Sequence, residues 1–107
     1  MTQKEIMKRD NILINYLIEN KGRENCKSSK EISVFLTEQG YPTTVANVSS
    51  IVMKIINERF SPICSLNTKG YYWAKDKNDI LECLNHLKSR VMALQNHIAI
   101  LENYIIN

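Results

Sequence analysis

Residues 28–59 read SSKEISVFLTEQGYPTTVANVSSIVMKIINER, a pattern of two short helices separated by a tight turn. Ser28 and Glu31 have the spacing of a capping box, which predicts that the first helix begins directly after Ser28. Gly40 is suited to the position just beyond the end of that helix, and Pro42 forces the chain to turn. The chain is therefore expected to reverse sharply and begin a new helix.

The second helix of this pair is expected to begin at Thr43 or Thr44 and to run to about Arg59. Its apolar residues recur at helical spacing and form one stripe: Val45, Val48, Ile51, Val52, Ile55 and Ile56. Its other side is polar, with Asn47, Ser50, Lys54 and Asn57. Two short helices joined by a tight turn that contains Gly are typical of the helix-turn-helix motif.

The segments on either side predict a third helix and a β-hairpin. Upstream, a helix is expected from about Lys4 to Asn20, ended by Gly22. Downstream, residues 62–66 and 71–74 are short β-prone runs, and residues 67–70 between them have hairpin-turn chemistry. An antiparallel two-stranded ribbon directly after a helix-turn-helix is a wing. The expected fold class is mostly α with a small β-hairpin.

The last segment predicts one long helix, from about Lys77 to Ile106, capped by Asp76 or Asn78. Apolar residues recur along it at alternating steps of four and three, which is a heptad seam. The seam consists of Ile80, Leu84, Leu87, Val91, Leu94, Ile98, Leu101 and Ile105. We therefore divide the chain into a helix-turn-helix domain, residues 1–75, and a dimerisation helix, residues 76–107.

The heptad seam has two interpretations. It can form an intermolecular coiled coil, which we favour because eight seam positions exceed what a small domain needs to cover, or it can fold back on the first helix. Leucine at d positions with mostly β-branched residues at a positions is preferred by parallel two-stranded coils. An antiparallel arrangement of the tail helices stays open. In both the parallel and the antiparallel coiled coil, the predicted partner is a second copy of the chain.

Composition and motifs exclude several function classes. The net charge is +3, and residues 1–60 hold nine Lys/Arg against seven Asp/Glu, a modest basic surplus. No apolar run approaches the roughly 20 residues that span a bilayer. No phosphate-binding loop, nucleophile elbow or paired metal motif is present, and three widely spaced cysteines indicate free thiols. We expect a cytoplasmic protein that is no enzyme, with no cofactor, metal or membrane association.

The order of elements resembles the winged helix-turn-helix proteins of bacterial regulators and of phages or other mobile elements. The stretch Lys69-Gly70-Tyr71-Tyr72-Trp73-Ala74, with Leu87-Lys88-Ser89-Arg90 further on, looks like the wing and tail helix of small phage-borne members. The resemblance covers the whole chain as an architecture and implies DNA binding.

A helix-turn-helix places its second helix in the major groove, N-terminal residues first. The candidate base-contacting residues are therefore Thr43, Thr44, Asn47 and Ser50, with Asn47 as the main reader because asparagine bonds adenine bidentately. Lys54 and Arg59 on the same helix, Lys27 and Lys30 near the preceding helix, and Lys69 at the wing tip are candidates for phosphate contacts. Tyr71, Tyr72 and Trp73 are expected mainly to pack in the core.

The sequence predicts a homodimeric protein that binds double-stranded DNA sequence-specifically, as a transcriptional regulator. Two alternatives stay open. Winged proteins of this size also serve plasmid or phage partition and replication control. A winged-helix module can instead bind another protein, as an anti-repressor does, and the recognition helix here has no Arg or Lys before Lys54.

Overall fold

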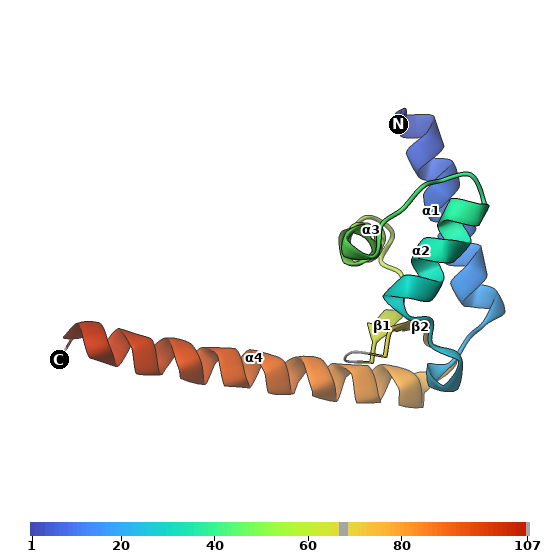
Figure 1. The fold of residues 1–107 in the computed structure, drawn as a ribbon. Coiled ribbons are helices and arrows are strands. Elements are labelled where there is room, and N and C mark those ends of the chain that lie inside the picture. Colours follow the sequence, from blue (N-terminus) through green and yellow to red (C-terminus); the bar gives the residue numbers. More distant parts are fainter. Residues whose placement is uncertain (67–68, 107) are drawn as a thin grey trace.

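The computed structural model describes residues 1–66 and 69–106 of the 107-residue chain. The elements in chain order are α1 (Gln3–Glu19), a short 3-10 helix η1 (Arg23–Asn25), α2 (Ser29–Glu38), α3 (Val45–Arg59), β1 (Ile63–Ser65), β2 (Tyr71–Trp73) and α4 (Lys77–Ile106). Figure 1 shows α1, α2 and α3 packed together above the hairpin, while α4 leaves the domain as one extended rod. The predicted fold class is confirmed: a mostly helical chain with a two-stranded antiparallel hairpin after three helices and a 30-residue C-terminal helix.

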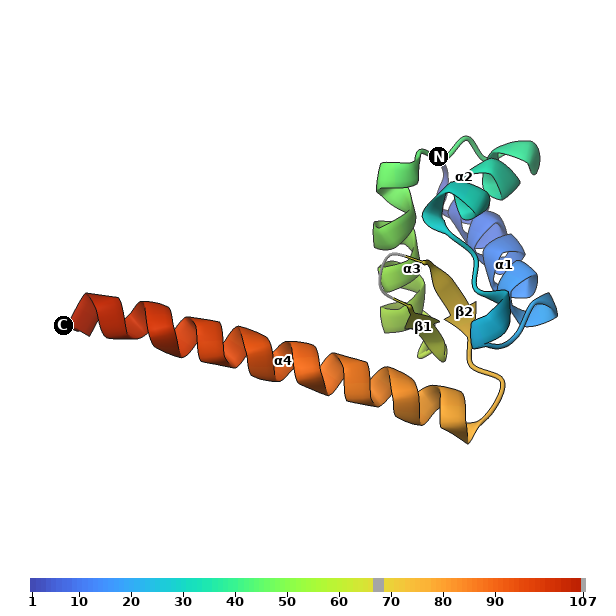
Figure 2. The ribbon, with the colours of Figure 1, turned by 60° about the horizontal axis from the view of Figure 1, so that its bottom comes forward.

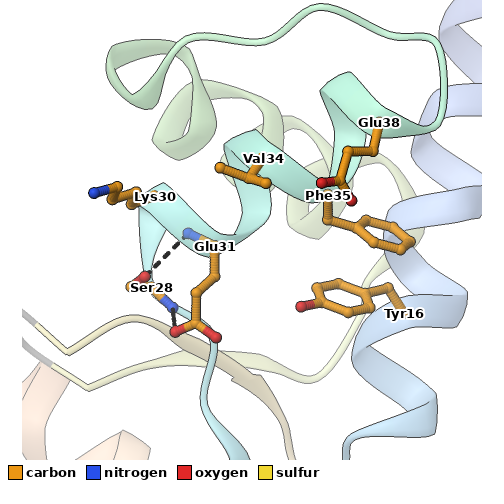
Figure 3. A pocket seen from close by; sticks show the side chains of 7 residues that line it. All are labelled: Tyr16, Ser28, Lys30, Glu31, Val34, Phe35 and Glu38. Carbon is orange, nitrogen blue, oxygen red and sulfur yellow. Dashed lines mark hydrogen bonds between the residues drawn. The ribbon is translucent and has the colours of Figure 1, made fainter.

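Local capping determines where the helices begin. The Ser28 hydroxyl accepts the backbone N–H of Glu31 at 3.1 Å, and the Glu31 carboxylate accepts the N–H of Ser28 at 3.2 Å (Figure 3). This is the predicted capping box. Thr2 and Glu5 form an equivalent box, and α1 begins at Gln3, one residue before the predicted start. Asp76 caps α4, because its carboxylate accepts the N–H of Asp79 at 3.0 Å.

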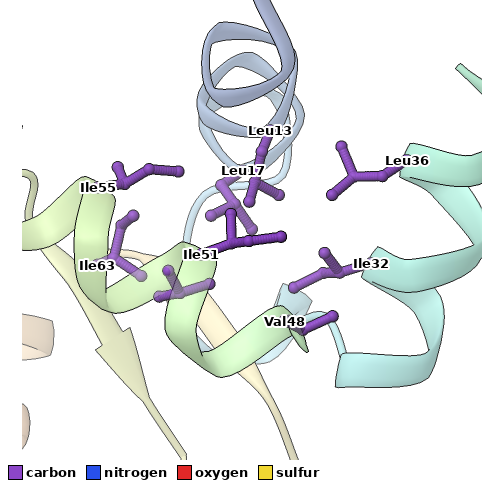
Figure 4. Packing of buried hydrophobic residues seen from close by; sticks show 9 residues of the cluster. Leu13, Leu17, Ile32, Leu36, Val48, Ile51, Ile55 and Ile63 are labelled. Carbon is purple, nitrogen blue, oxygen red and sulfur yellow. The ribbon is translucent and has the colours of Figure 1, made fainter. Parts of the chain in front are cut away.

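The core lies where α1, α2 and α3 meet (Figure 4). Its buried members come from all three helices and from β1: Leu13, Leu17, Ile32, Leu36, Val48, Ile51, Val52, Ile55 and Ile63. Val45, placed in the apolar stripe by its spacing, is instead 52% exposed because it lies in the first turn of α3, ahead of the buried residues. The core therefore fixes one face of α3 and leaves the opposite face free.

The hairpin pairs Cys64 with Tyr72 and is extended by a third segment. Lys27, just before α2, exchanges backbone hydrogen bonds with Tyr71 at 2.7 and 2.8 Å. Tyr72 is 2% exposed, and its strand neighbours pack partly against the core, which confirms the predicted packing role of the aromatic run. Residues 67–68 of the predicted hairpin turn lie outside the described residues. The Lys27 pairing anchors the hairpin to the start of α2.

An aromatic pair closes the outer side of the α1–α2 contact. The rings of Tyr16 and Phe35 stack with their centroids 3.9 Å apart and their planes 8° from parallel (Figure 3). The ammonium of Lys27 lies 5.7 Å from the centre of the Tyr16 ring, within the range of a cation–π contact. This side of the domain is therefore occupied by structural contacts between α1, α2 and the segment before α2.

Polar contacts fix the direction in which α4 leaves the domain. Asp79 is 7% exposed and its carboxylate accepts the N–H of Lys75 at 3.1 Å. Arg23 of η1 forms an ion pair with Glu82 of α4 at 2.6 Å. The helix does not fold back along α1; beyond its first turns it projects away from the other elements (Figures 1 and 2). None of the described helices is both long enough and apolar enough to cross a membrane.

The first turns of α4 also cover the hairpin face opposite the core. Cys64 of β1 is 5% exposed, and this burial, together with the neighbouring Cys83 thiol of α4, raises the pKa of Cys64 to about 12. Burial likewise raises the pKa of Tyr72, its partner across the hairpin. Both groups therefore stay protonated at neutral pH and contribute to packing.

The hairpin approaches the segment before α2 closely at Gly70, and a substitution there tests this contact. A Cβ at Gly70 would lie 2.1 Å from the backbone oxygen of Lys27, and its φ is +133°. We expect Gly70→Ala to lower the free energy of unfolding by at least about 2 kcal/mol, because both strain and overlap oppose it. Gly40→Ala is the matched control: its φ is +95° with no atom within 4 Å. It should lose only about 1 kcal/mol in urea denaturation, and equal losses would contradict the close approach.

Candidate nucleic-acid interface

Hydroxyl groups fix the turn between α2 and α3. Ser33, 9% exposed, donates its hydroxyl to the carbonyl of Thr43, and the Thr37 hydroxyl accepts the N–H of Thr43 at 3.2 Å. The Thr43 hydroxyl in turn donates to the carbonyl of Tyr41 at 2.7 Å. Thr43 is half-buried and its polar groups are used within the turn. This predicted base-contacting residue therefore has a structural role in orienting α3.

The other three predicted base-contacting residues lie on the exposed leading half of α3. Thr44 is the N-cap residue and is exposed, and Asn47 and Ser50 are exposed within the first two turns. The Ser50 hydroxyl donates to the backbone carbonyl of Asn47 at 3.1 Å. No acidic residue lies in the first turn of α3. A neutral, hydrogen-bonding surface of this kind can approach the edges of base pairs.

Helical periodicity shows that sequence reasoning missed part of the outward face. The direction opposite the buried residues of α3 passes through four exposed residues, of which Ala46 and Met53 are not on the predicted polar side: Ala46, Ser50, Met53 and Asn57. Asn47 lies on the flank of this surface that also carries Lys54. The buried residues predict this position: Ala46 lies two residues before Val48, and Met53 lies two residues after Ile51. Two residues are about half a helical turn, so both side chains point away from the core.

Lys54 has intramolecular partners. Its ammonium lies 2.8 Å from the Asp10 carboxylate of α1 and 3.2 Å from Glu58. Asp10 is 1% exposed and also accepts hydrogen bonds from Arg9 at 3.1 and 3.2 Å. The hydrogen bond that the Lys54 ammonium donates to Asp10 is the main cause that raises the pKa of Lys54. Lys54 therefore connects α3 to α1, and its charge is already matched without DNA.

The remaining predicted phosphate-contacting residues have different environments. Lys30 and Lys69 are exposed, and Figure 3 shows Lys30 pointing away from the Tyr16–Phe35 stack. Lys27 is half-buried, and Arg59 donates a hydrogen bond to the Asn11 side chain. Lys30 and Lys69 are therefore the predicted contacts whose charged groups are available to a ligand.

A groove of about 390 Å³ separates α3 from α4. Met53 and Ile56 of α3 line one side, and Leu87, Val91 and Leu94 of α4 line another, with β1 at its base. Figure 2 shows α3 running at a steep angle to α4, which extends past it toward the C-terminus. Three predicted seam residues, Leu87, Val91 and Leu94, thus face the C-terminal half of α3, whereas none of the predicted DNA-contacting residues lines the groove.

All eight predicted seam positions of α4 are exposed in the single chain. Their exposed fractions run from 40% at Leu84 to 86% at Ile105. The apolar stripe of a helix normally packs against another element, and this burial stabilises the helix. In the single chain the stripe of α4 has no such partner. The seam is therefore available to a second chain.

The Asp10–Lys54 contact can be tested by stability and by pH. Lys54→Met should lower the free energy of unfolding by roughly 1–2 kcal/mol at pH 7, because Asp10 stays buried while Lys54 is a third exposed. The raised pKa means that this contribution is present below about pH 10 and is lost as the pH rises through that pKa. Urea midpoints of both proteins should therefore converge at alkaline pH. Glu58→Gln is the control; a loss as large as that of Lys54→Met would contradict the assignment to Asp10.

Comparison of the chain with protein-family models, curated proteins and solved structures gives no match. The features that bear on function are those of the chain itself. They are an exposed and uncharged leading half of α3, the exposed lysines Lys30 and Lys69, and an apolar seam on α4 that faces the same groove as α3.

Proposed function

We propose that this protein binds double-stranded DNA sequence-specifically as a homodimer and acts as a transcriptional regulator of the winged helix-turn-helix type. The observation that carries the proposal is the division of α3 into two faces. Val48, Ile51 and Ile55 are buried in the core, while Ser50 projects from the opposite side and Asn47 is exposed on the adjoining flank, with no acidic residue in the first turn. A helix held in this way fits the major groove with its leading residues toward the bases.

The proposed contacts divide into base reading and backbone positioning. Asn47 can accept and donate toward adenine in a bidentate pair, and Ser50 can bond to several bases. Lys30 belongs to α2 and Lys69 to the hairpin. In the proposed complex they reach DNA phosphates on either side of the major groove that α3 occupies. Lys54 is left out of the interface, because its ammonium is bonded to Asp10. Affinity per chain is therefore modest, and specificity depends on a few uncharged groups.

Self-association through α4 supplies the second half of the proposal. Two joined copies read two half-sites, and the second contact then forms at the high effective concentration that the link provides. The exposed seam of α4 is the surface that supports this assembly. Plasmid or phage partition and replication control use the same kind of contact with repeated sites. DNA fragments retained from the protein's own source separate these roles, because neighbouring genes and site repetition differ.

The reading and positioning roles can be separated in one binding assay. Protein is incubated with fragmented DNA from its own source, and the retained fragments are sequenced. Asn47→Ala should reduce discrimination between sites by about 1–3 kcal/mol. Lys69→Ala should weaken binding to all fragments by a similar factor. It should also lower the magnitude of the slope of log affinity against log salt concentration by about 1. Asn96→Ala and Lys4→Ala, both at exposed positions away from α3 and the hairpin, are the matched controls and should change nothing.

A protein-binding function is the second candidate. It is favoured by Val45, an apolar residue that is 52% exposed in the first turn of α3, close in sequence to the proposed base-contacting residues. A module of this type would retain no fragment above background, and Asn47→Ala would be silent in the DNA assay. That outcome, obtained with the folded dimer, would overturn the DNA-binding proposal in favour of a protein partner.

Self-association itself has a sharp test in α4. Val91 lies in the middle of the seam and is 51% exposed, so a charged residue there costs the single chain little. Val91→Glu should weaken the dimer at least about 100-fold, since pairing would bury unmatched carboxylates. Ser89→Glu, on the outer side of the same helix, should remain dimeric. Sedimentation equilibrium measures both, and an unchanged Val91→Glu dimer would show that the seam is not the interface.

A further inference from the structure

The groove between α3 and α4 shows which flank of the seam faces the domain. Its lining includes Cys83, Leu87, Arg90 and Leu94 of α4, which are successive g and d positions of the heptads. Met53 and Ile56 of α3 form the facing wall. A helix that packs on the seam must therefore pass along this wall. Its side chains meet α3 as well as α4.

The C-terminal half of α4 carries a second strip beside the seam, mostly apolar and without Lys, Arg, Asp or Glu. Ala93, His97, Ile100 and Tyr104 follow one another at steps of four, three and four, so they lie on one side of the helix. They occupy c and g positions, on the same flank as the residues that line the groove. Ile100 is 49% exposed and Tyr104 is 81% exposed. A seam made of a and d positions alone does not account for this strip.

The exposed apolar surface of the molecule is concentrated on this helix. Thirteen of the nineteen exposed large hydrophobic residues in the described parts of the chain belong to α4. Monomeric proteins rarely leave contiguous apolar patches larger than a few hundred Å² uncovered. The helix is about 45 Å long, so its seam and strip need an extended apolar partner. A second copy of α4 has that length and pattern.

We propose that the groove is filled by the α4 helix of a second copy, running antiparallel, with its Ala93–Tyr104 strip against Met53 and Ile56. The proposal rests on the self-association included in the proposed function and specifies its geometry. The pairs across the dimer are Ile80 with Ile105, Leu84 with Leu101, Leu87 with Ile98, and Val91 with Leu94. Each a position then faces a d position, and all eight seam residues are covered.

The direction follows from what each arrangement places against α3. In an antiparallel pair, a twofold axis perpendicular to the helices brings the same flank of both helices to the same side. The partner's g and c residues, His97 and Ile100, then meet the α3 wall. In a parallel pair, a g flank meets an e flank, which would place Lys88 and Gln95 there instead. Covering a charged group with apolar surface is unfavourable, so the apolar strip favours the antiparallel arrangement.

The arrangement assigns different parts of α3 to different partners. The second copy covers Met53 and Ile56 in the C-terminal half of α3. Asn47 and Ser50, in the leading half, remain exposed. The two domains lie on opposite halves of the paired helices, so dimer formation sets the distance between the two leading halves.

Chemical crosslinking tests the direction. One chain carries Leu84→Cys and a differently tagged chain carries Leu101→Cys, co-expressed and treated with a short thiol-reactive crosslinker. Both chains carry alanine in place of the three native cysteines, Cys26, Cys64 and Cys83. This cysteine-free protein must first sediment like the parent protein. We expect products between unlike chains to exceed products between like chains at least tenfold. Products between like chains would show a parallel dimer and overturn the proposal.

A second measurement keeps all native cysteines and tests the groove itself. Ile100→Glu should weaken the dimer at least tenfold, because the strip is buried against α3; in a parallel coil this position faces solvent and the change would be silent. Met92→Glu is the matched control, since Met92 is 68% exposed on the other flank. A silent Ile100→Glu overturns the groove contact. A parent protein that sediments as a monomer would instead overturn the self-association part of the proposed function.

Discussion

The packing of α3 against α1 and α2 is the constraint on which every functional feature depends. Val48, Val52 and Ile55 are fully buried in this contact, so α3 cannot rotate about its axis without exposing them. Burying side chains of this size contributes about 1.5–3 kcal/mol each, which is far more than any surface contact of the helix contributes. The Lys54–Asp10 ion pair lies at the edge of the same contact and fixes the flank of α3. The surface of α3 that is available to a ligand is therefore determined by which of its residues the core buries.

The hairpin and α4 depend on contacts between segments that are distant in sequence. Lys27 pairs with Tyr71 across the hairpin edge, and Gly70 permits this approach because it has no Cβ. Asp79 and the Arg23–Glu82 ion pair then set the exit of α4 from the domain. Because α4 is a continuous helix, a small difference at its first turn becomes a large displacement at its far end. The polar contacts at this exit therefore determine where the seam lies relative to α3.

Local features of this fold could be predicted from the sequence, and nonlocal pairings could not. Ser28 and Glu31 are three residues apart, so their capping box is visible as spacing. The heptad seam and the change to strand periodicity after Pro62 are local in the same sense. The partner of Lys54 lies 44 residues away, and Lys27 pairs across a comparable separation, which no periodicity encodes. Thr43 is predicted to lie at the interface because its place in the turn is visible in the sequence, whereas the hydrogen bond that its N–H donates to the Thr37 hydroxyl is not.

The neutral surface of α3 bears on why dimerisation matters to the proposed function. Most of the affinity of proteins for DNA comes from neutralising phosphates, and base contacts add mainly selectivity. In the proposed function α3 offers selectivity without charge, because its one central lysine is bonded to Asp10. The available charge lies on Lys30 and Lys69, which is few contacts for a single chain. Linking two chains through α4 doubles those contacts and makes the second binding event intramolecular. Under the proposed function, occupancy of a site then depends on the dimer equilibrium, and the seam controls DNA binding without touching DNA.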